Sequence, residues 1–287
     1  MDDFTGKVAV VTGAASDRPM PLAGAFAAEG MRLVLADIES DPLELAAGEL
    51  RDAGADVFAV TADVSVASEV DRIADAAMDV FGAVHVACNN AGVAAGGLSW
   101  EIDLEDWRWV LGVNLFGVIH GIHSFVPRII ESGGGHVVNT ASMAGLTSNA
   151  GMGPYNASKH AVVTISETLG LELSMTHPEV GVTVLCPGWV RTQINRSERN
   201  RPRRADGPAA RPDDSGDRAG DDGGLRSIVD QLIESGLEPD DIAAMVVDAI
   251  RTNRFYVLTH PEWQSLVTQR VEHILSGEPP AMNLPGN

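Results

Sequence analysis

The chain has 287 residues, a length that suits one α/β domain with a sizeable hydrophobic core. Its 20 Lys and Arg against 40 Asp and Glu give a formal net charge of −20, which argues against nucleic acid or an anionic membrane surface as a partner. Cys88 and Cys186 are too few for a disulfide framework, and neither a basic leader nor eighteen consecutive apolar residues are present. We therefore expect a cytoplasmic protein that does not span a membrane.

Short β-branched segments alternate along the chain with Ala-rich or amphipathic segments. The predicted strands are residues 7–12, 31–36, 56–62, 83–88, 136–140, 182–186 and 255–258, and the predicted helices are residues 21–30, 42–53, 66–81, 104–131, 155–177, 239–251 and 261–275. This alternation predicts an α/β fold with one doubly wound parallel sheet and helices on both faces.

Residues 191–226 interrupt the alternation, because they are rich in Arg, Asp, Gly and Pro. The first half of this segment is basic and the second half acidic, so the two halves can neutralise each other. The segment is either a solvated, mobile loop or a lid over a pocket at the strand ends. We expect a single domain over residues 1–287, with this segment as an irregular insertion.

The turn after the first strand, residues 12–19, lies where an open parallel sheet receives the pyrophosphate of a dinucleotide. Asp37 ends the second strand, where its carboxylate can accept hydrogen bonds from the hydroxyls of an adenosine ribose and would repel a 2′-phosphate. This favours NAD over NADP. The alternative for Asp37 is a helix-capping or solvated loop acid.

Tyr155 and Lys159 are four residues apart at the start of a predicted helix, so their side chains share one face. An ammonium beside a phenol stabilises the phenolate and lowers the tyrosine pKa, which makes the phenol a usable general acid or base. The chain holds only two tyrosines and two lysines, which reduces the odds that this spacing arose by chance.

With these motifs the chain resembles the short-chain dehydrogenase/reductase family over residues 7–191, and more loosely in its C-terminal part. The shared pieces, in chain order, are Thr12 and Gly13; Asp37; Asp63 and Val64; Asn89, Asn90, Ala91 and Gly92; Asn114; Ser142 ahead of Met143, Ala144 and Gly145; Tyr155 and Lys159; and Pro187, Gly188 and Thr192. The resemblance implies a Rossmann fold of about seven strands in the order 3-2-1-4-5-6-7, and an NAD-dependent short-chain alcohol dehydrogenase or ketoreductase.

The resemblance assigns catalytic roles to four residues. Tyr155 would exchange a proton with the substrate oxygen, and Lys159 would also hold the nicotinamide ribose. Ser142 would polarise the substrate oxygen, and Asn114 would support a water-mediated proton path to Lys159. Taken alone, Ser142 reads as a strand-end turn residue and Asn114 as a packed polar residue or a helix irregularity.

The resemblance also assigns residues to the NAD site. Besides Tyr155 and Lys159 they are Gly13, Asp37, Asp63, Val64, Asn90, Gly92, Pro187, Gly188, Val190 and Thr192. Asp63 and Val64 would line the adenine pocket, and Val190 and Thr192 would approach the nicotinamide amide.

The chain departs from the family in the phosphate-binding turn, where Asp17 and Pro19 replace two glycines. The Asp17 carboxylate would oppose the pyrophosphate, unless it turns away to cap the helix or Arg18 swings over and offsets its charge. The competing hypothesis is therefore a catalytically silent relative that keeps the fold as a binding or assembly protein. A third hypothesis is different chemistry through the same tyrosine, such as dehydration or epimerisation.

The predicted substrate wall is apolar and consists of Val93, Ala94, Leu98, Met143, Met152 and Trp189. We expect a secondary alcohol or ketone on an apolar small molecule; a bulky alicyclic alcohol and an aliphatic alcohol both fit this wall. His120 and His123 lack further ligands at metal-binding spacing, so we predict no metal. The apolar helices over residues 104–131 and 155–177 predict a homodimer or homotetramer.

Overall fold

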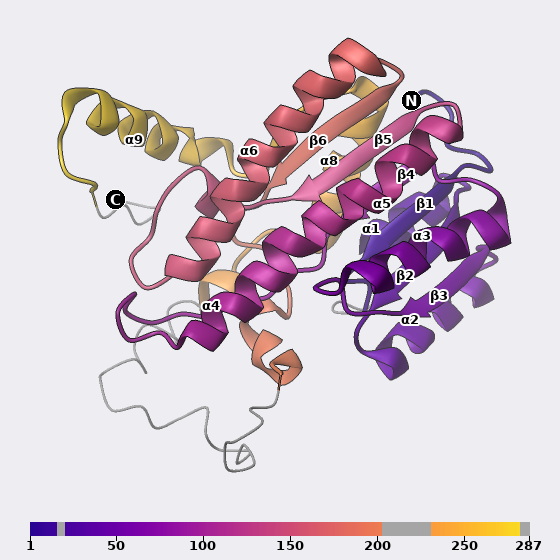
Figure 1. The fold of residues 1–287 in the computed structure, drawn as a ribbon, viewed down its shortest axis with the longest axis horizontal. Helices are drawn as coiled ribbons and strands as arrows, with labels where there is room; N and C mark the ends of the chain where they lie inside the picture. Colours follow the sequence, from indigo (N-terminus) through magenta and orange to yellow (C-terminus); the bar gives the residue numbers. More distant parts are fainter. Residues whose placement is uncertain (16–20, 203–230, 282–287) are drawn as a thin grey trace.

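Seven parallel strands form the central sheet of the computed structural model, which describes residues 1–15, 21–202 and 231–281 (Figure 1). The order β3-β2-β1-β4-β5-β6-β7 confirms the predicted topology. The strands are β1 (Val8–Thr12), β2 (Arg32–Asp37), β3 (Val57–Thr61), β4 (Val86–Asn89), β5 (Gly135–Thr140), β6 (Val180–Cys186) and β7 (Tyr256–Leu258). Val11 of β1 is in register with Leu35 of β2 and Cys88 of β4, which places β1 inside the sheet.

Helices cover both faces of this sheet. The α-helices are α1 (Pro21–Ala28), α2 (Ser40–Asp52), α3 (Ala67–Phe81), α4 (Leu104–Leu111), α5 (Gly117–Glu131), α6 (Gly153–Thr176), α8 (Pro239–Thr252) and α9 (Gln264–Ser276). A π-helical turn, η1 (Gly112–Phe116), joins α4 to α5, and the 3₁₀ turns are η2 (Met143–Gly145), η3 (Ile194–Asn200) and η4 (Pro261–Trp263).

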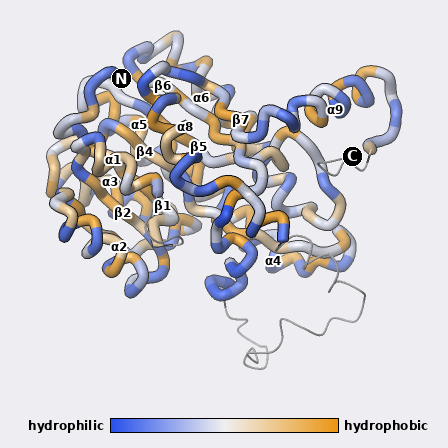
Figure 2. The backbone as a smooth tube through the Cα atoms, turned by 180° about the vertical axis from the view of Figure 1, so that it is seen from behind, coloured by the Kyte–Doolittle hydropathy of each residue, from blue (hydrophilic) through white to orange (hydrophobic). Residues whose placement is uncertain are grey.

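Two apolar clusters form because neighbouring strand residues point to opposite faces. Ala9 and Val11 pack with the buried sides of α1, α2 and α8, whereas Val10 between them packs with α3, α5 and α6. Figure 2 shows mostly hydrophobic colour along the inner strands and hydrophilic colour on many outer segments. Burial on both faces explains why the strands are almost wholly apolar.

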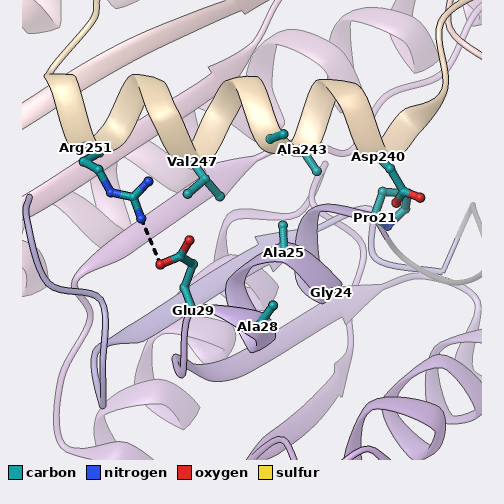
Figure 3. Close-up of a pocket in the computed structure, with 10 residues that line it drawn as sticks. Pro21, Gly24, Ala25, Ala28, Glu29, Asp240, Ala243, Val247 and Arg251 are labelled. Carbon is teal, nitrogen blue, oxygen red and sulfur yellow. Dashed lines mark hydrogen bonds and ion pairs between the residues drawn. The ribbon is translucent and has the colours of Figure 1, made fainter.

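A shallow groove runs along the line where α1 packs against α8 (Figure 3). Small residues such as Gly24 and Ala243 line it, and an ion pair of 2.9 Å between Glu29 and Arg251 crosses one end. None of the residues that the sequence assigns to the active site lines this groove, so we regard it as a feature of helix packing.

The predicted helix over residues 104–131 is present, but it contains the π turn around Asn114. This run is long and apolar enough to cross a membrane, by length and composition alone. In the fold it packs against α3 and α6, and part of its surface is buried there. We therefore read it as a core helix of the α/β sandwich.

Candidate active site

Tyr155 and Lys159 lie at the carboxyl edge of the sheet, on the first turns of α6. The helix begins at Gly153, two residues before the predicted start, because Pro154 fits a first helical turn. Both side chains are buried, with exposed fractions of 8% for Tyr155 and 2% for Lys159. Nζ of Lys159 lies 5.6 Å from the centroid of the Tyr155 ring, so the predicted shared face brings the two groups together.

Ser142 lies at the end of β5 and contacts Tyr155. Its hydroxyl accepts a hydrogen bond from the N–H of Ala144 at 3.1 Å, as the N-cap of η2. The same hydroxyl lies 3.3 Å from the carbonyl oxygen of Pro187 and hydrogen-bonds to the Tyr155 phenol. Ser142 therefore serves both as the expected turn residue and as a neighbour of the tyrosine.

Asn114 is fully buried in the π turn, and its amide closes the loop that follows β4. Its Oδ1 accepts a hydrogen bond from the Val93 N–H at 2.8 Å, and its Nδ2 donates to the Val93 carbonyl at 2.9 Å and to the Ser158 hydroxyl at 3.2 Å. A Cβ atom built on Gly92 would lie 3.6 Å from Oδ1 of Asn114 and 3.7 Å from Nζ of Lys159. Gly92 therefore lies between the two predicted catalytic residues.

Two threonines tie the strand ends together: Thr12 of the shared motif, and Thr140, which the sequence analysis did not single out. The carbonyl oxygen of Thr140 accepts a hydrogen bond of 2.7 Å from Nζ of Lys159. The hydroxyl of Thr12 accepts hydrogen bonds from the N–H groups of Asn90 and Ala91 at 3.0 and 3.2 Å. These bonds fix the ends of β1, β4 and β5 relative to α6.

Burial dominates the pKa values of the pair on α6. Loss of solvent lowers the pKa of Lys159 to about 8 and raises the pKa of Tyr155 above its ordinary value. The hydrogen bond with Ser142 partly offsets the rise for Tyr155. We expected Lys159 to lower the tyrosine pKa, whereas in this arrangement the cost of burying a phenolate is the largest effect and raises that pKa.

The predicted cofactor edge is built from the turn after β1 and the end of β2. Gly13 has φ +71°, and a Cβ atom there would lie 2.6 Å from Cα of Ala91, so only glycine fits this turn. Asp37 is buried, and its two oxygens accept hydrogen bonds from the N–H groups of Ala15 at 2.8 Å and Glu39 at 3.0 Å. Burial raises the pKa of Asp37, and these donors act against that rise.

Other predicted cofactor residues lie on neighbouring loops. Asp63 follows β3 and accepts a hydrogen bond from the Ser65 N–H at 2.9 Å, and Val64 is buried against Gly117. Val190, after β6, pairs with Leu237 in an isolated bridge. The half-buried Thr192 follows in the same loop. Arg18, Asp17 and Pro19 lie outside the residues that the structure describes.

The predicted substrate wall divides into buried and open members. Met143 and Val93 are buried in two separate apolar clusters, so they support the site from beneath. Leu98 is 46% exposed, and its neighbour Gly97 pairs with Met152. Half-buried Trp189 meets the ring of Trp263 edge to face, at 6.3 Å between centroids. Half-buried Ala94 contacts the segment after β6, described next.

Residues 191–202 run from the end of β6 back across the loops at the strand ends. Arg199 forms a two-pronged ion pair with Glu39, just beyond Asp37, with a shortest distance of 2.8 Å. The hydroxyl of Ser197 accepts a hydrogen bond from the Ala94 N–H at 3.0 Å, and Arg201 pairs with Asp106 of α4. The composition allows this basic half to neutralise the acidic half of the insertion; within the described residues, Arg199 and Arg201 pair with the body of the protein. Residues 203–230 lie outside the described part.

The cysteines and the possible metal ligands supply no reactive group or metal site to the described part of this arrangement. Cys88 and Cys186 are free and buried, and burial raises the pKa of the Cys186 thiol to about 12, so both are unreactive core thiols. Within the described ranges, no three His, Cys, Asp or Glu side chains are grouped so that they could hold a metal ion.

Comparison with known proteins agrees with this geometry. The family of short chain dehydrogenases matches residues 7–203. A 1-deoxy-11-beta-hydroxypentalenate dehydrogenase of Streptomyces exfoliatus is 36% identical over 259 residues, which cover 89% of this chain and 84% of the relative. A short chain dehydrogenase/reductase from Burkholderia phymatum, solved in complex with NAD, is 44% identical with a TM-score of 0.90, covering 99% of both chains.

A more distant solved structure, an actinorhodin polyketide ketoreductase with NADPH, is 28% identical with a TM-score of 0.73 and covers 90% of this chain and 97% of the other. The similar proteins thus include one crystallised with NAD and one with NADPH. The matched family, the sheet order and the resemblance of the motifs all agree, and the chain belongs to the short-chain dehydrogenase/reductase family.

Proposed function

We propose that the protein transfers a hydride between NAD and a secondary alcohol or ketone on an apolar small molecule. The observation that carries the proposal is a connected set of four polar side chains at one edge of the sheet: Ser142 lies by Tyr155, Tyr155 by Lys159, and both Lys159 and Asn114 border Gly92. A buried phenol, a buried ammonium and a hydroxyl in contact with that phenol provide an acid–base site for a substrate oxygen.

The chain itself would handle the proton. During alcohol oxidation the phenolic oxygen of Tyr155 takes the proton of the substrate hydroxyl, and during ketone reduction it returns that proton. Ser142, which hydrogen-bonds to the same phenol, shares the substrate oxygen. With a pKa of about 8, Lys159 is mostly protonated at pH 7 and stabilises negative charge on the phenol. Bound NAD supplies the acceptor or donor of the hydride.

The residues at the cofactor edge fit a nicotinamide dinucleotide. A Cβ at Gly13 would collide with the backbone of Ala91, so this turn keeps the narrow profile that lets a pyrophosphate approach. Each oxygen of Asp37 accepts one backbone N–H and keeps a lone pair for a ribose hydroxyl. A 2′-phosphate would meet this carboxylate and be repelled, which is why we propose NAD over NADP.

The proposed substrate is an apolar alcohol, with alicyclic secondary alcohols as the first class to test. The predicted wall of the site is apolar, and the Streptomyces relative is named for a hydroxylated pentalenate. Trp189 and Met152 are the two large half-buried members of this wall. A long aliphatic alcohol is the competing substrate within the same chemistry.

An absorbance assay at 340 nm tests the proposal. Purified protein is mixed with NAD or NADP and with matched alicyclic and linear secondary alcohols, and the reverse reaction is run with the ketones. We expect turnover with NAD and an alicyclic alcohol. Preference for NADP would refute the role of Asp37, and preference for the linear alcohols would refute the substrate class.

The main alternative is a catalytically silent relative, which Asp17 and Pro19 favour because they replace glycines in the phosphate-binding turn. Titration of the wild type with NADH, followed by fluorescence, separates the two hypotheses: we propose weak binding, whereas the silent protein would bind none. If binding is weak for the stated reason, the double change Asp17→Gly and Pro19→Gly should tighten it.

We also propose that the protein is a cytoplasmic homodimer or homotetramer that associates through the run α4–η1–α5 and through α6. Apolar side chains are exposed on these helices, including Phe116 at 49%, Leu171 at 68% and Met175 at 76%. The two free buried cysteines suit a reducing compartment. A monomer in sedimentation at micromolar concentration would refute the assembly.

A further inference from the structure

The peptide group between Pro187 and Gly188 is hydrogen-bonded on both of its sides. Its carbonyl oxygen accepts a hydrogen bond from the Met143 N–H at 2.8 Å and lies 3.3 Å from the hydroxyl of Ser142. Its N–H donates to the hydroxyl oxygen of Thr259 at 3.1 Å. One rigid peptide unit therefore connects the proposed catalytic serine with the residue that follows β7.

A histidine fixes the Thr259 hydroxyl from behind. Nδ1 of His260 lies 2.7 Å from Oγ1 of Thr259, and both residues are at least nine-tenths buried. Because the Gly188 N–H already occupies one lone pair of Oγ1, the hydroxyl proton is free to point to Nδ1 of a neutral imidazole. Burial lowers the pKa of His260, which favours this neutral form.

The imidazole also fills the space above Gly188. A Cβ atom at Gly188 would lie 2.5 Å from Nδ1 of His260, so the ring rests directly on the glycine. The centroid of the His260 ring lies 5.0 Å from that of Trp263, which in turn contacts Trp189 beyond the glycine. The loop after β6 is thus held by a hydrogen bond at its N–H and by packed rings behind it.

We propose that Thr259 is a positioning residue for hydride transfer. Its hydroxyl, which His260 orients, fixes the Pro187–Gly188 peptide. This peptide in turn fixes Ser142 and the nicotinamide side of the cofactor cleft. The inference rests on the proposed function, in which this loop faces the nicotinamide. The contact between Ser142 and Pro187 is longer than a normal O–H···O hydrogen bond. This weak contact orients the Ser142 hydroxyl, and a bound substrate oxygen can replace the Pro187 carbonyl as the acceptor of its proton.

The test compares two ligands that differ only at the nicotinamide end. Thr259→Val removes the hydroxyl and keeps the shape, Thr259→Ser restores it, and Kd is measured for NADH and for ADP-ribose, which lacks the nicotinamide. Losing one hydrogen bond that orders the loop should raise the NADH Kd about tenfold in Thr259→Val. The ADP-ribose Kd should stay within about twofold, and Thr259→Ser should recover the wild-type values.

Thr183→Val is the matched control, because the buried Thr183 hydroxyl also bonds to one backbone group and one histidine: it donates to Arg254 O and pairs with His136. This control should lower the free energy of unfolding, but it should not change the NADH Kd relative to the ADP-ribose Kd. Should Thr259→Val fail to fold, Thr259→Cys replaces it, because a thiol is a weak acceptor.

Equal changes for NADH and ADP-ribose, or no change for either, would overturn the positioning role while leaving the proposed oxidoreductase intact. A wild-type protein that binds neither ligand would refute the proposed function and this inference with it. In a wild type that turns over substrate, kcat of Thr259→Val should also fall, because Ser142 loses its fixed neighbour.

Discussion

The amide of Asn114 should be a sensitive point of the site, since it pairs with both the N–H and the C=O of buried Val93 in the loop after β4. Replacing Asn114 with Ala removes three hydrogen bonds, two to the buried backbone of Val93 and one to Ser158. Ser158 keeps a partner, because its hydroxyl also donates to the Tyr155 carbonyl at 2.7 Å, but the N–H and C=O of Val93 are left unpaired. Each unpaired buried group costs about 1–3 kcal/mol, so we expect the free energy of unfolding to fall by about 2–4 kcal/mol.

Urea unfolding followed by circular dichroism measures this loss. Asn114→Asp is the matched variant, because it keeps the acceptor for the Val93 N–H but has no N–H to donate to the Val93 carbonyl or to Ser158. A decrease of less than about 1 kcal/mol for Asn114→Ala would refute the reasoning, since it would mean that water or a shifted loop satisfies Val93 at little cost.

Three further predictions use other parts of the site. The pKa of Lys159 falls from 10.5 to about 8 on folding. Between pH 8 and pH 10.5 the unfolded chain therefore binds more protons than the folded one, and the free energy of unfolding rises by up to about 1.4 kcal/mol per pH unit. In urea unfolding at several pH values, Lys159→Met should abolish this rise, and an unchanged slope would contradict the burial of the ammonium. Gly145→Ala would place a Cβ 2.6 Å from the Lys159 carbonyl oxygen and should lower the Tm. The control Gly48→Ala, in α2, meets open space and should not lower it. Equal Tm values for the two variants would show that η2 can shift to accommodate the added methyl group. Asp37→Asn should narrow the preference for NAD over NADP in kcat/KM by about tenfold or more, and an unchanged ratio would separate Asp37 from cofactor choice.

The strands and helices follow from local patterns, and the sequence therefore predicts their number and type well. The exceptions have physical causes outside those patterns. The π turn lies at Asn114, whose side chain pairs with Val93, 21 residues away, and no helical periodicity reveals that pairing. The order of the strands came from the family resemblance, since apolar runs alone do not say which strands are neighbours.

Much of the candidate site could also be anticipated, because its motifs are local. The spacing of Tyr155 and Lys159 predicts their shared face, and both side chains lie there. The partners that the sequence analysis missed are distant in the chain: Thr140 for Lys159, and Arg199 for Glu39 across 160 residues. A threonine at a strand end was the one available signal, and it is too common to be specific.

The central claim is that Tyr155 moves the proton, and one pair of variants tests it most directly. Tyr155→Phe should lower kcat by about 10²–10⁴-fold while the NADH Kd stays within about threefold, because the hydroxyl carries the proton but contributes little to cofactor affinity. The control is Tyr256→Phe, at the chain's other tyrosine, which is 46% exposed and hydrogen-bonded to Glu167; its kcat should match the wild type. A Tyr155→Phe protein that keeps more than about a tenth of the wild-type rate would contradict the account.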